Sequence, residues 1–279
     1  LFNLFTKSAK DFLDSWFEND HIKACFGFDS IVGNYASPET PGSAYILLHH
    51  VFGEIDGEKG AWGHAVGGMG SITQLMKDVC EEKGVEISTN AAVKKVLIKN
   101  NKAIGVMLED GSQVFADKVI SNLNPKLLFK KLVDKNDVDR EYRRKILNYK
   151  CGSGTFRMNV ALSELPDFNC LPGKKISEHH MSGIVIAPSL TYMDQAFTDA
   201  KQYGWSKNPI VEMLIPSTVD SSLAPEGKHV ASLFCQQFAP ILPDNKSWHY
   251  EKNNAANTLV ETDNRFAPNF KKSILGMSI

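Results

Sequence analysis

The pattern of apolar and polar positions divides the chain into a helix-rich start and a strand-rich remainder. Over residues 1–60 the large apolar side chains recur near helical spacing, most clearly over residues 12–17. A turn at residues 37–42 (SPETPG) precedes a second predicted helix at residues 43–55 (SAYILLHHVFGEI). We therefore expect residues 1–60 to be mainly helical. Their long apolar side chains form either core or the wall of a hydrophobic substrate cavity.

The period changes to two over residues 85–121, where apolar side chains alternate with polar ones. Asn100 and Asn101 tolerate a positive φ and can close one hairpin, and the Asp-Gly pair at residues 110–111 can close the next. This region is therefore expected to hold four short strands.

A glycine-rich stretch at residues 61–75 (AWGHAVGGMGSITQL) precedes these strands. It lacks the third glycine of the G-x-G-x-x-G dinucleotide fingerprint, and no Gly-Lys-Ser/Thr triplet is present. A tight turn that packs closely on a neighbour is therefore favoured over a phosphate-binding loop. The following residues predict a helix over 71–83, with Ser71 as its N-cap and Gly84 closing its end.

Beyond residue 124 helices and longer strands alternate. A charged helix is expected over residues 137–150, capped by Asp139. The predicted strands are residues 153–162, 182–190, 210–218 and 228–240, and the further helices are residues 191–205 and 251–266. Strands separated by single helices, with Pro and Gly between them, predict an α+β fold in which helices cover one side of a mostly antiparallel sheet.

The predicted strand TFRMNVAL, at residues 155–162, has two distinct faces because strand side chains alternate. The apolar face, expected to be core, comprises Phe156, Met158, Val160 and Leu162. The other face comprises Thr155, Arg157 and Asn159. That face borders either bulk water or a substrate cavity. In a closed site Arg157 would need an anionic partner, such as a substrate carboxylate or a nearby acid, because it cannot lose its charge.

Composition narrows the possible functions of the 279-residue chain. A formal net charge of −1 without a basic stripe disfavours a nucleic-acid partner. No apolar run approaches the ~20 residues of a membrane span, and the start has neither the basic front nor the cleavage site of a signal peptide. Five widely spaced cysteines without a C-x-x-C pair indicate reduced thiols. The histidines form adjacent pairs rather than a ligand pattern, so we expect no metal site.

Several motifs occur in an order that resembles phytoene-dehydrogenase-related FAD-dependent oxidoreductases. They are GGMG, a helix, GVEI, NAAVKKV, GVMLEDG and ADKVISN, all within residues 67–122. One branch of that family is most similar in the later segments FRMNVALSELPDF, IPSTVDSSLAPEGKHVASLFCQQFAP and FAPNFKKSILG. The resemblance implies a helical part of the substrate domain at residues 1–60, a remnant of the FAD-binding domain at 61–123, and a substrate-binding domain at 124–279.

The same resemblance implies roles for individual residues. Val93 is expected to hydrogen-bond the adenine of FAD through its backbone; without the resemblance it would be interpreted as a core strand residue. Gly67 and Gly68 are expected to pack near the flavin side of the fold. In such proteins the substrate-domain sheet lies over the flavin, which would place Arg157 and Asn159 at the substrate cavity. The resemblance indicates neither catalytic residues nor an oligomeric state.

The intact protein is thus expected to transfer hydride from a small, hydrophobic substrate to FAD. The chain opens on Leu1 and has no dinucleotide fingerprint. We therefore expect a fragment without the N-terminal Rossmann motif and the C-terminal FAD segment, inactive and free of FAD. The alternative is a non-catalytic interaction or regulatory protein that retains a flavoenzyme fold. The expected compartment is the cytoplasm for a bacterial protein and the mitochondrial matrix for a eukaryotic one.

Overall fold

The computed structural model describes residues 2–279, which form two compact units. The first combines the chain up to Gln74 with Gly152–Ile279, and the second is Leu75–Cys151. The boundaries of these two units differ from those of the predicted segments. Residues 61–74 belong to the first unit, and residues 124–151 belong to the second because their helices pack with the strand β3 (Val93–Lys99). Which unit serves FAD and which serves substrate remains a prediction.

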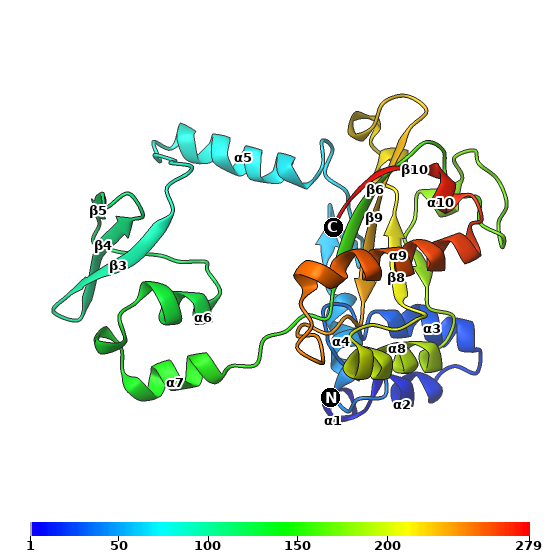
Figure 1. Ribbon diagram of the computed structural model, residues 1–279, viewed down its shortest axis with the longest axis horizontal. Helices are drawn as coiled ribbons and strands as arrows, with labels where there is room; N and C mark the ends of the chain where they lie inside the picture. The colour runs from blue at the N-terminus through cyan, green and yellow to red at the C-terminus, as the bar shows by residue number, and fades with distance from the viewer. Residues whose placement is uncertain (1) are drawn as a thin grey trace. The chain divides into compact units, whose positions relative to one another are not determined.

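A five-stranded antiparallel sheet organises the first unit (Figure 1). Its order is β10-β6-β9-β8-β7, and each neighbouring pair is antiparallel. The strands are β6 Phe156–Leu162, β7 Ile184–Ile186, β8 Ile210–Leu214, β9 His229–Gln236 and β10 Ile274–Ser278. The predicted α+β fold with an antiparallel sheet is confirmed, although the sequence analysis missed β10.

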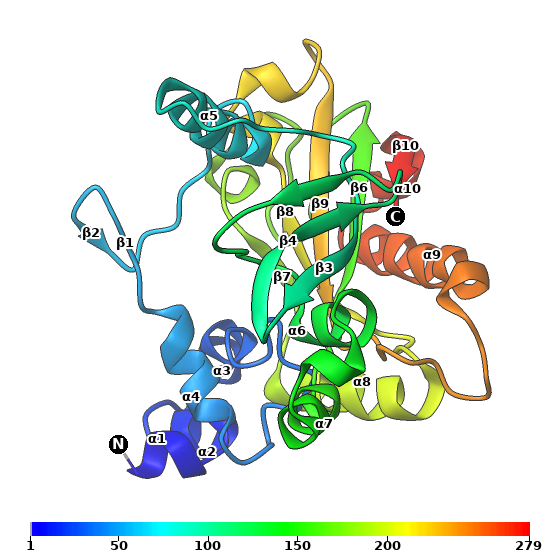
Figure 2. The ribbon, with the colours of Figure 1, turned by 90° about the vertical axis from the view of Figure 1, so that its left-hand side faces the viewer.

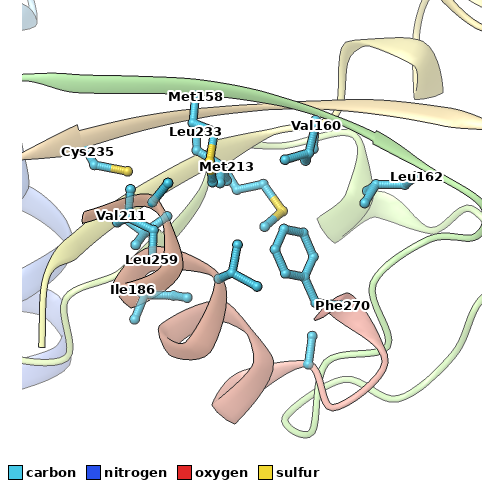
Figure 3. Close-up of a cluster of buried hydrophobic side chains, with 14 of the residues drawn as sticks. Met158, Val160, Leu162, Ile186, Val211, Met213, Leu233, Cys235, Leu259 and Phe270 are labelled. Atoms are coloured by element: carbon cyan, nitrogen blue, oxygen red, sulfur yellow. The ribbon is translucent and has the colours of Figure 1, made fainter. Parts of the chain in front are cut away.

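The main core lies between one face of this sheet and the helix α9 (Trp248–Phe266). Along β6 buried and exposed residues alternate strictly, and the buried set is the predicted apolar one. Met158, Val160 and Leu162 share this core with Leu259 of α9 and Phe270 (Figure 3). Fully burying side chains of this size contributes about 1.5–3 kcal/mol each. The sheet therefore depends on α9 for the cover of its apolar face.

A second buried cluster joins the N-terminal helices to α8 (Leu190–Tyr203). These helices are α1 Phe2–Thr6, α2 Ala9–Asp14, α3 Asp20–Phe28 and α4 Ser43–His50. The predicted helix over residues 43–55 is wrong beyond His50, where the chain forms the short hairpin β1 Glu54–Ile55 and β2 Glu58–Lys59. Asp56 and Gly57 both take a positive φ there, which is the geometry of an Asp-Gly hairpin turn.

Short helices complete the first unit. They are the 3₁₀ turns η3 Glu178–His180, η4 Pro216–Thr218 and η5 Ser221–Leu223, and the helix α10 Phe270–Ser273. The helix α5 Met69–Glu82 runs from the first unit into the second. It begins two residues before the predicted start, so Ser71 is not its N-cap: the Ser71 hydroxyl donates to the Gly68 carbonyl at 2.7 Å. Its predicted end is confirmed, because Gly84 has a φ of 78° and the Val85 N–H bonds back to Cys80.

The second unit is built on a three-stranded antiparallel sheet, β3-β4-β5 (Figure 2). Its further elements are β4 Lys102–Leu108, β5 Gln113–Phe115, α6 Pro125–Leu127, the π-helix η1 Leu128–Leu132, the 3₁₀ turn η2 Lys135–Asp137 and α7 Arg140–Asn148. Both predicted hairpin turns are confirmed, and Asp139 caps α7. Of the four strands predicted over residues 85–121, the first is wrong, because residues 85–92 pair with no strand in the described chain.

Some features are absent from the part of the chain that the structure describes. No helix within residues 2–279 is long and apolar enough to cross a bilayer. The described side chains include no group of three or more His, Cys, Asp or Glu that could hold a metal ion. All five cysteines carry free thiols.

The core contains one acid whose burial has a measurable consequence. Asp263 of α9 is fully buried, and neither of its carboxyl oxygens has a hydrogen-bond partner among the described residues. Burial raises the pKa of Asp263 well above its usual range, because an ionised carboxylate is poorly solvated in the core. The folded protein therefore holds Asp263 protonated over a pH range in which the unfolded chain ionises it.

We predict that Asp263→Asn changes how stability depends on pH. A raised folded pKa stabilises the fold fully below the unfolded pKa of about 3.9, and this contribution is lost as the pH rises towards the folded value. Asn cannot ionise, so the variant escapes that loss. Its unfolding free energy relative to the parent chain should rise between pH 5 and pH 7, by at most about 2.7 kcal/mol, the limit for one proton over two pH units. Denaturant unfolding at both pH values measures the change.

The exposed Glu226→Gln supplies the matched control, since it removes the same charge from the surface. Its stability should follow the parent chain at both pH values. If the unfolding free energies of Asp263→Asn and the parent chain change equally between pH 5 and pH 7, the pKa of Asp263 does not differ between the folded and unfolded states in that range.

Candidate functional site

The sheet face opposite α9 brings polar side chains from three neighbouring strands together. In the strand register Arg157 of β6 lies opposite Phe234 of β9, and Phe234 lies opposite Glu212 of β8. In the next row Asn159 lies between Ser232 of β9 and Ser278 of β10. These two neighbouring rows contain four polar side chains around the ring of Phe234. We call the five residues together the polar row: Arg157, Ser232, Phe234, Glu212 and Asn159. Both predicted cavity residues, Arg157 and Asn159, therefore lie on one face and are exposed.

Contacts with β9 fix the guanidinium of Arg157. Its Nη1 donates to Ser232 Oγ at 2.8 Å, and its Cζ lies 4.5 Å from the centroid of the Phe234 ring. A cation over an aromatic ring gains about 0.5–1 kcal/mol at an exposed position. No carboxylate in the described chain lies within 4.0 Å of Arg157. Its position is thus set by neutral groups, which leaves it able to bind an anion.

Two half-buried acids, Glu212 and Asp29, have raised pKa values, and the charge of Asp29 acts on Glu212. Burial raises the pKa of Glu212, the negative charge of Asp29 raises it further, and Arg157 and His50 oppose that shift. Burial also raises the pKa of Asp29, which follows α3, with His50 at the end of α4 again acting in the opposite direction. The two acids therefore hold protons at a higher pH than ordinary carboxyl groups do.

Glu212, Asp29 and His50 were not predicted from the sequence. These residues come from separate elements that only the fold brings together. One signal was available for Glu212, because it is the single charged residue in the apolar strand sequence IVEML. His50 gave no such signal, because it is adjacent to His49 and such a pair lacks the spacing of metal ligands.

The glycine turn of residues 67–68 is held by hydrogen bonds within the first unit. Gly67 and Gly68 have φ values of 85° and 83°, a backbone conformation that residues with a side chain rarely adopt. The Gly67 N–H donates to Asp220 Oδ2 at 2.7 Å, and the Gly68 N–H donates to the Ala65 carbonyl at 2.9 Å. Both N–H groups are used by the protein itself, so this turn does not fit the pyrophosphate of a dinucleotide.

Asp220 fixes this turn and was not predicted from the sequence. Its carboxylate also accepts hydrogen bonds from the hydroxyl and the N–H of Ser222. The Nε2 of His64 lies 3.7 Å from Asp220 Oδ2. The Ser222 hydroxyl contributes most to lowering the pKa of Asp220, and the Gly67 N–H follows. The Asp-Ser-Ser order at residues 220–222 is the available signal, because aspartate commonly bonds backbone two residues on.

Val93 lies in the second unit, apart from the other predicted site residues, which all belong to the first. It is the first residue of β3, is half-buried and lies opposite Leu108. The strand register shifts between Val93 and Lys95, and such irregularities leave a backbone group outside the regular ladder. The contact between the Val93 backbone and adenine stays a prediction.

Comparison with known proteins supports the resemblance inferred from the motifs. Residues 5–155 match the family described as flavin containing amine oxidoreductase. The chain is 34% identical over 284 residues to the pyridine nucleotide-disulfide oxidoreductase domain-containing protein 2 of Rattus norvegicus, covering 100% of this chain and 49% of that protein. It is 24% identical over 238 residues to a phytoene desaturase (lycopene-forming) of Pseudescherichia vulneris, covering 85% of this chain and 43% of that one.

A solved structure has a similar fold. An oxidoreductase from Methanosarcina mazei superposes with a TM-score of 0.65 at 18% identity, covering 98% of this chain and 55% of that one. This likeness concerns the fold alone. The chain spans about half the length of the curated relatives it matches. The predicted relation to phytoene-dehydrogenase-like proteins is confirmed, and the similar branch is the pyridine nucleotide-disulfide oxidoreductase domain-containing protein 2 type. The chain belongs to the flavin containing amine oxidoreductase family.

Proposed function

We propose that the intact protein is an FAD-dependent oxidoreductase that takes hydride from a C–H bond of a small, mainly apolar molecule. The family match over residues 5–155 is the observation that carries this proposal. When bound, FAD would supply the hydride acceptor. The relative named phytoene desaturase supports an apolar substrate, because its name describes an enzyme that forms lycopene.

The polar row would form one wall of the substrate cavity. Its polar centre is flanked on the same face by exposed apolar side chains: Val185 lies opposite Glu212, and Leu214 lies opposite Ser232. A molecule with an apolar body and one polar end would match this surface. Arg157 would hold that end if it is anionic. Arg157 would in turn oppose the rise in the pKa of Glu212 that burial causes.

FAD would be held in part by the second unit, through the backbone of Val93 at the adenine. Gly67 and Gly68 would shape the turn at the flavin side rather than bind phosphate, because their N–H groups already have partners. The 279 residues contain no G-x-G-x-x-G sequence to bind the pyrophosphate. We therefore expect this chain by itself to be inactive and to bind no FAD.

Val93→Pro tests the adenine contact in the intact protein. Proline removes the backbone N–H but is tolerated at the first residue of a strand. We expect the purified variant to lose most of its flavin on desalting, measured as the ratio of visible flavin absorbance to protein absorbance. Val93→Ile retains the backbone groups and should keep the parent ratio.

Far-UV circular dichroism of both variants shows whether β3 and its neighbours remain folded. If both variants are folded and hold equal flavin, Val93 does not contact the adenine. A colourless but well-folded parent protein would favour the alternative, an interaction or regulatory protein that retains the flavoenzyme fold.

Arg157→Gln tests whether the polar row binds substrate. Charge-assisted hydrogen bonds contribute about 1.5–3 kcal/mol, so kcat/KM for flavin reduction should fall roughly 10- to 100-fold. The melting temperature should change little, since Arg157 is exposed and its contacts are with neutral groups. Stopped-flow flavin reduction in the intact protein provides the rate.

The exposed Arg144→Gln removes the same charge from α7 and serves as the matched control. It should retain the parent rate. Equal kcat/KM for Arg157→Gln, Arg144→Gln and the parent protein would remove Arg157 from the substrate site.

A further inference from the structure

The second unit is basic although the whole chain is nearly neutral. Residues 75–151 contain 16 Lys and Arg against 11 Asp and Glu, while the net charge of the chain is −1. The first unit is correspondingly acidic. The composition of the whole chain does not show this separation of charge. An excess of basic residues in the second unit indicates an anionic ligand or partner of its own.

Much of this positive charge lines one open cavity of about 540 Å³ within the second unit. Six basic side chains line it: Lys94, Lys95, Lys130, Lys131, Lys135 and Arg143. We call this cavity the basic groove. Its single acidic side chain is Asp134, so its lining is strongly positive.

The basic residues come from distinct elements of the second unit. Lys94 and Lys95 lie on β3, Lys135 begins the turn η2, and Arg143 lies on α7. Lys130 and Lys131 are consecutive residues of the π-helix η1. A π-helical turn is rare and occurs frequently at functional sites, because its wider spacing changes where side chains project. The fold thus gathers charge that is scattered along the sequence.

Contacts within the protein neutralise little of this charge. Asp134 Oδ2 lies 3.9 Å from Lys95 Nζ, and its carboxylate also accepts the Asn136 N–H at 3.0 Å. The Arg143 Nε donates to the Phe129 carbonyl at 3.0 Å, which orients the guanidinium and leaves its two terminal amino groups available.

The four remaining lysines, Lys94, Lys130, Lys131 and Lys135, have no carboxylate within 4.0 Å in the described chain. Their mutual repulsion would be relieved by a bound anion.

The chemistry of the lining indicates which anion fits. Lysine ammonium groups and an oriented guanidinium are the donors that proteins use for phosphate. No aromatic side chain lines the groove, so nothing there would stack on a nucleobase. The volume is within the range of small-molecule sites. We propose that the basic groove binds a ligand with two or more phosphate groups, either free in solution or at a lipid headgroup.

This site differs from the proposed adenine contact, because adenine is uncharged and would be recognised by the Val93 backbone. The proposal does not depend on the redox function, and its test uses the 279-residue chain. Isothermal titration with sodium tripolyphosphate should detect binding that weakens steeply as salt is added. Lys130→Gln with Lys131→Gln should raise the dissociation constant at least about tenfold, because two ammonium contacts are lost.

The double variant Lys118→Gln with Lys126→Gln is the matched control, since it removes the same charge from the same unit outside the groove. Its dissociation constant should remain within about twofold of the parent value. Equal weakening of both double variants would overturn the proposal, because a general charge effect would then explain the binding.

Vesicles distinguish the two sources of phosphate. Sedimentation with phosphatidic acid vesicles, but not with pure phosphatidylcholine vesicles, would assign the groove to a lipid headgroup if Lys130→Gln with Lys131→Gln abolishes it. Tripolyphosphate binding without sedimentation would assign it to a soluble ligand. Binding of neither probe overturns the proposal. Loss of flavin from the intact protein carrying the same double variant would also overturn it, by assigning these lysines to the cofactor.

Discussion

The period-two alternation of β6 is the constraint on which the first unit depends. One set of its side chains is fully or nearly buried against α9, and the set between them cannot reach that core. A slip of one residue would place Arg157 in the core and Met158 outside it. Core packing therefore fixes the register of β6, and the register in turn fixes which polar groups meet on the opposite face.

That register explains why the polar row needs no short sequence motif. Arg157, Phe234 and Glu212 lie on three strands that are far apart in the sequence and become neighbours through antiparallel pairing. The face is therefore built by long-range order rather than by a loop. Rigid strands hold side chains more precisely than loops do, which suits the proposed wall of a substrate cavity.

Local sequence patterns predicted most of the elements, and they failed where long-range pairing decides. The strand at residues 156–162, the hairpin at Asn100 and Asn101 and the cap at Asp139 all follow from local chemistry. The strand β10 was missed because SILGMSI contains a glycine and little alternation, and it forms by pairing with β6. The site divides in the same way: Arg157 could be inferred from alternation, whereas Glu212, Asp29 and Asp220 acquire their surroundings only in the fold.

Two acids on opposite sides of this sheet show how partners change the effect of burial. Burial raises the pKa of both Asp263 and Glu212, but only Glu212 has positive charge from Arg157 and His50 to oppose the shift. The core therefore favours the neutral form of Asp263. The charge of Glu212 depends on its neighbours, so an anion bound to Arg157 would weaken the opposition and favour the protonated acid. Anion binding at Arg157 and proton uptake by Glu212 would thus be coupled, whereas the core acid has no such neighbour to respond to.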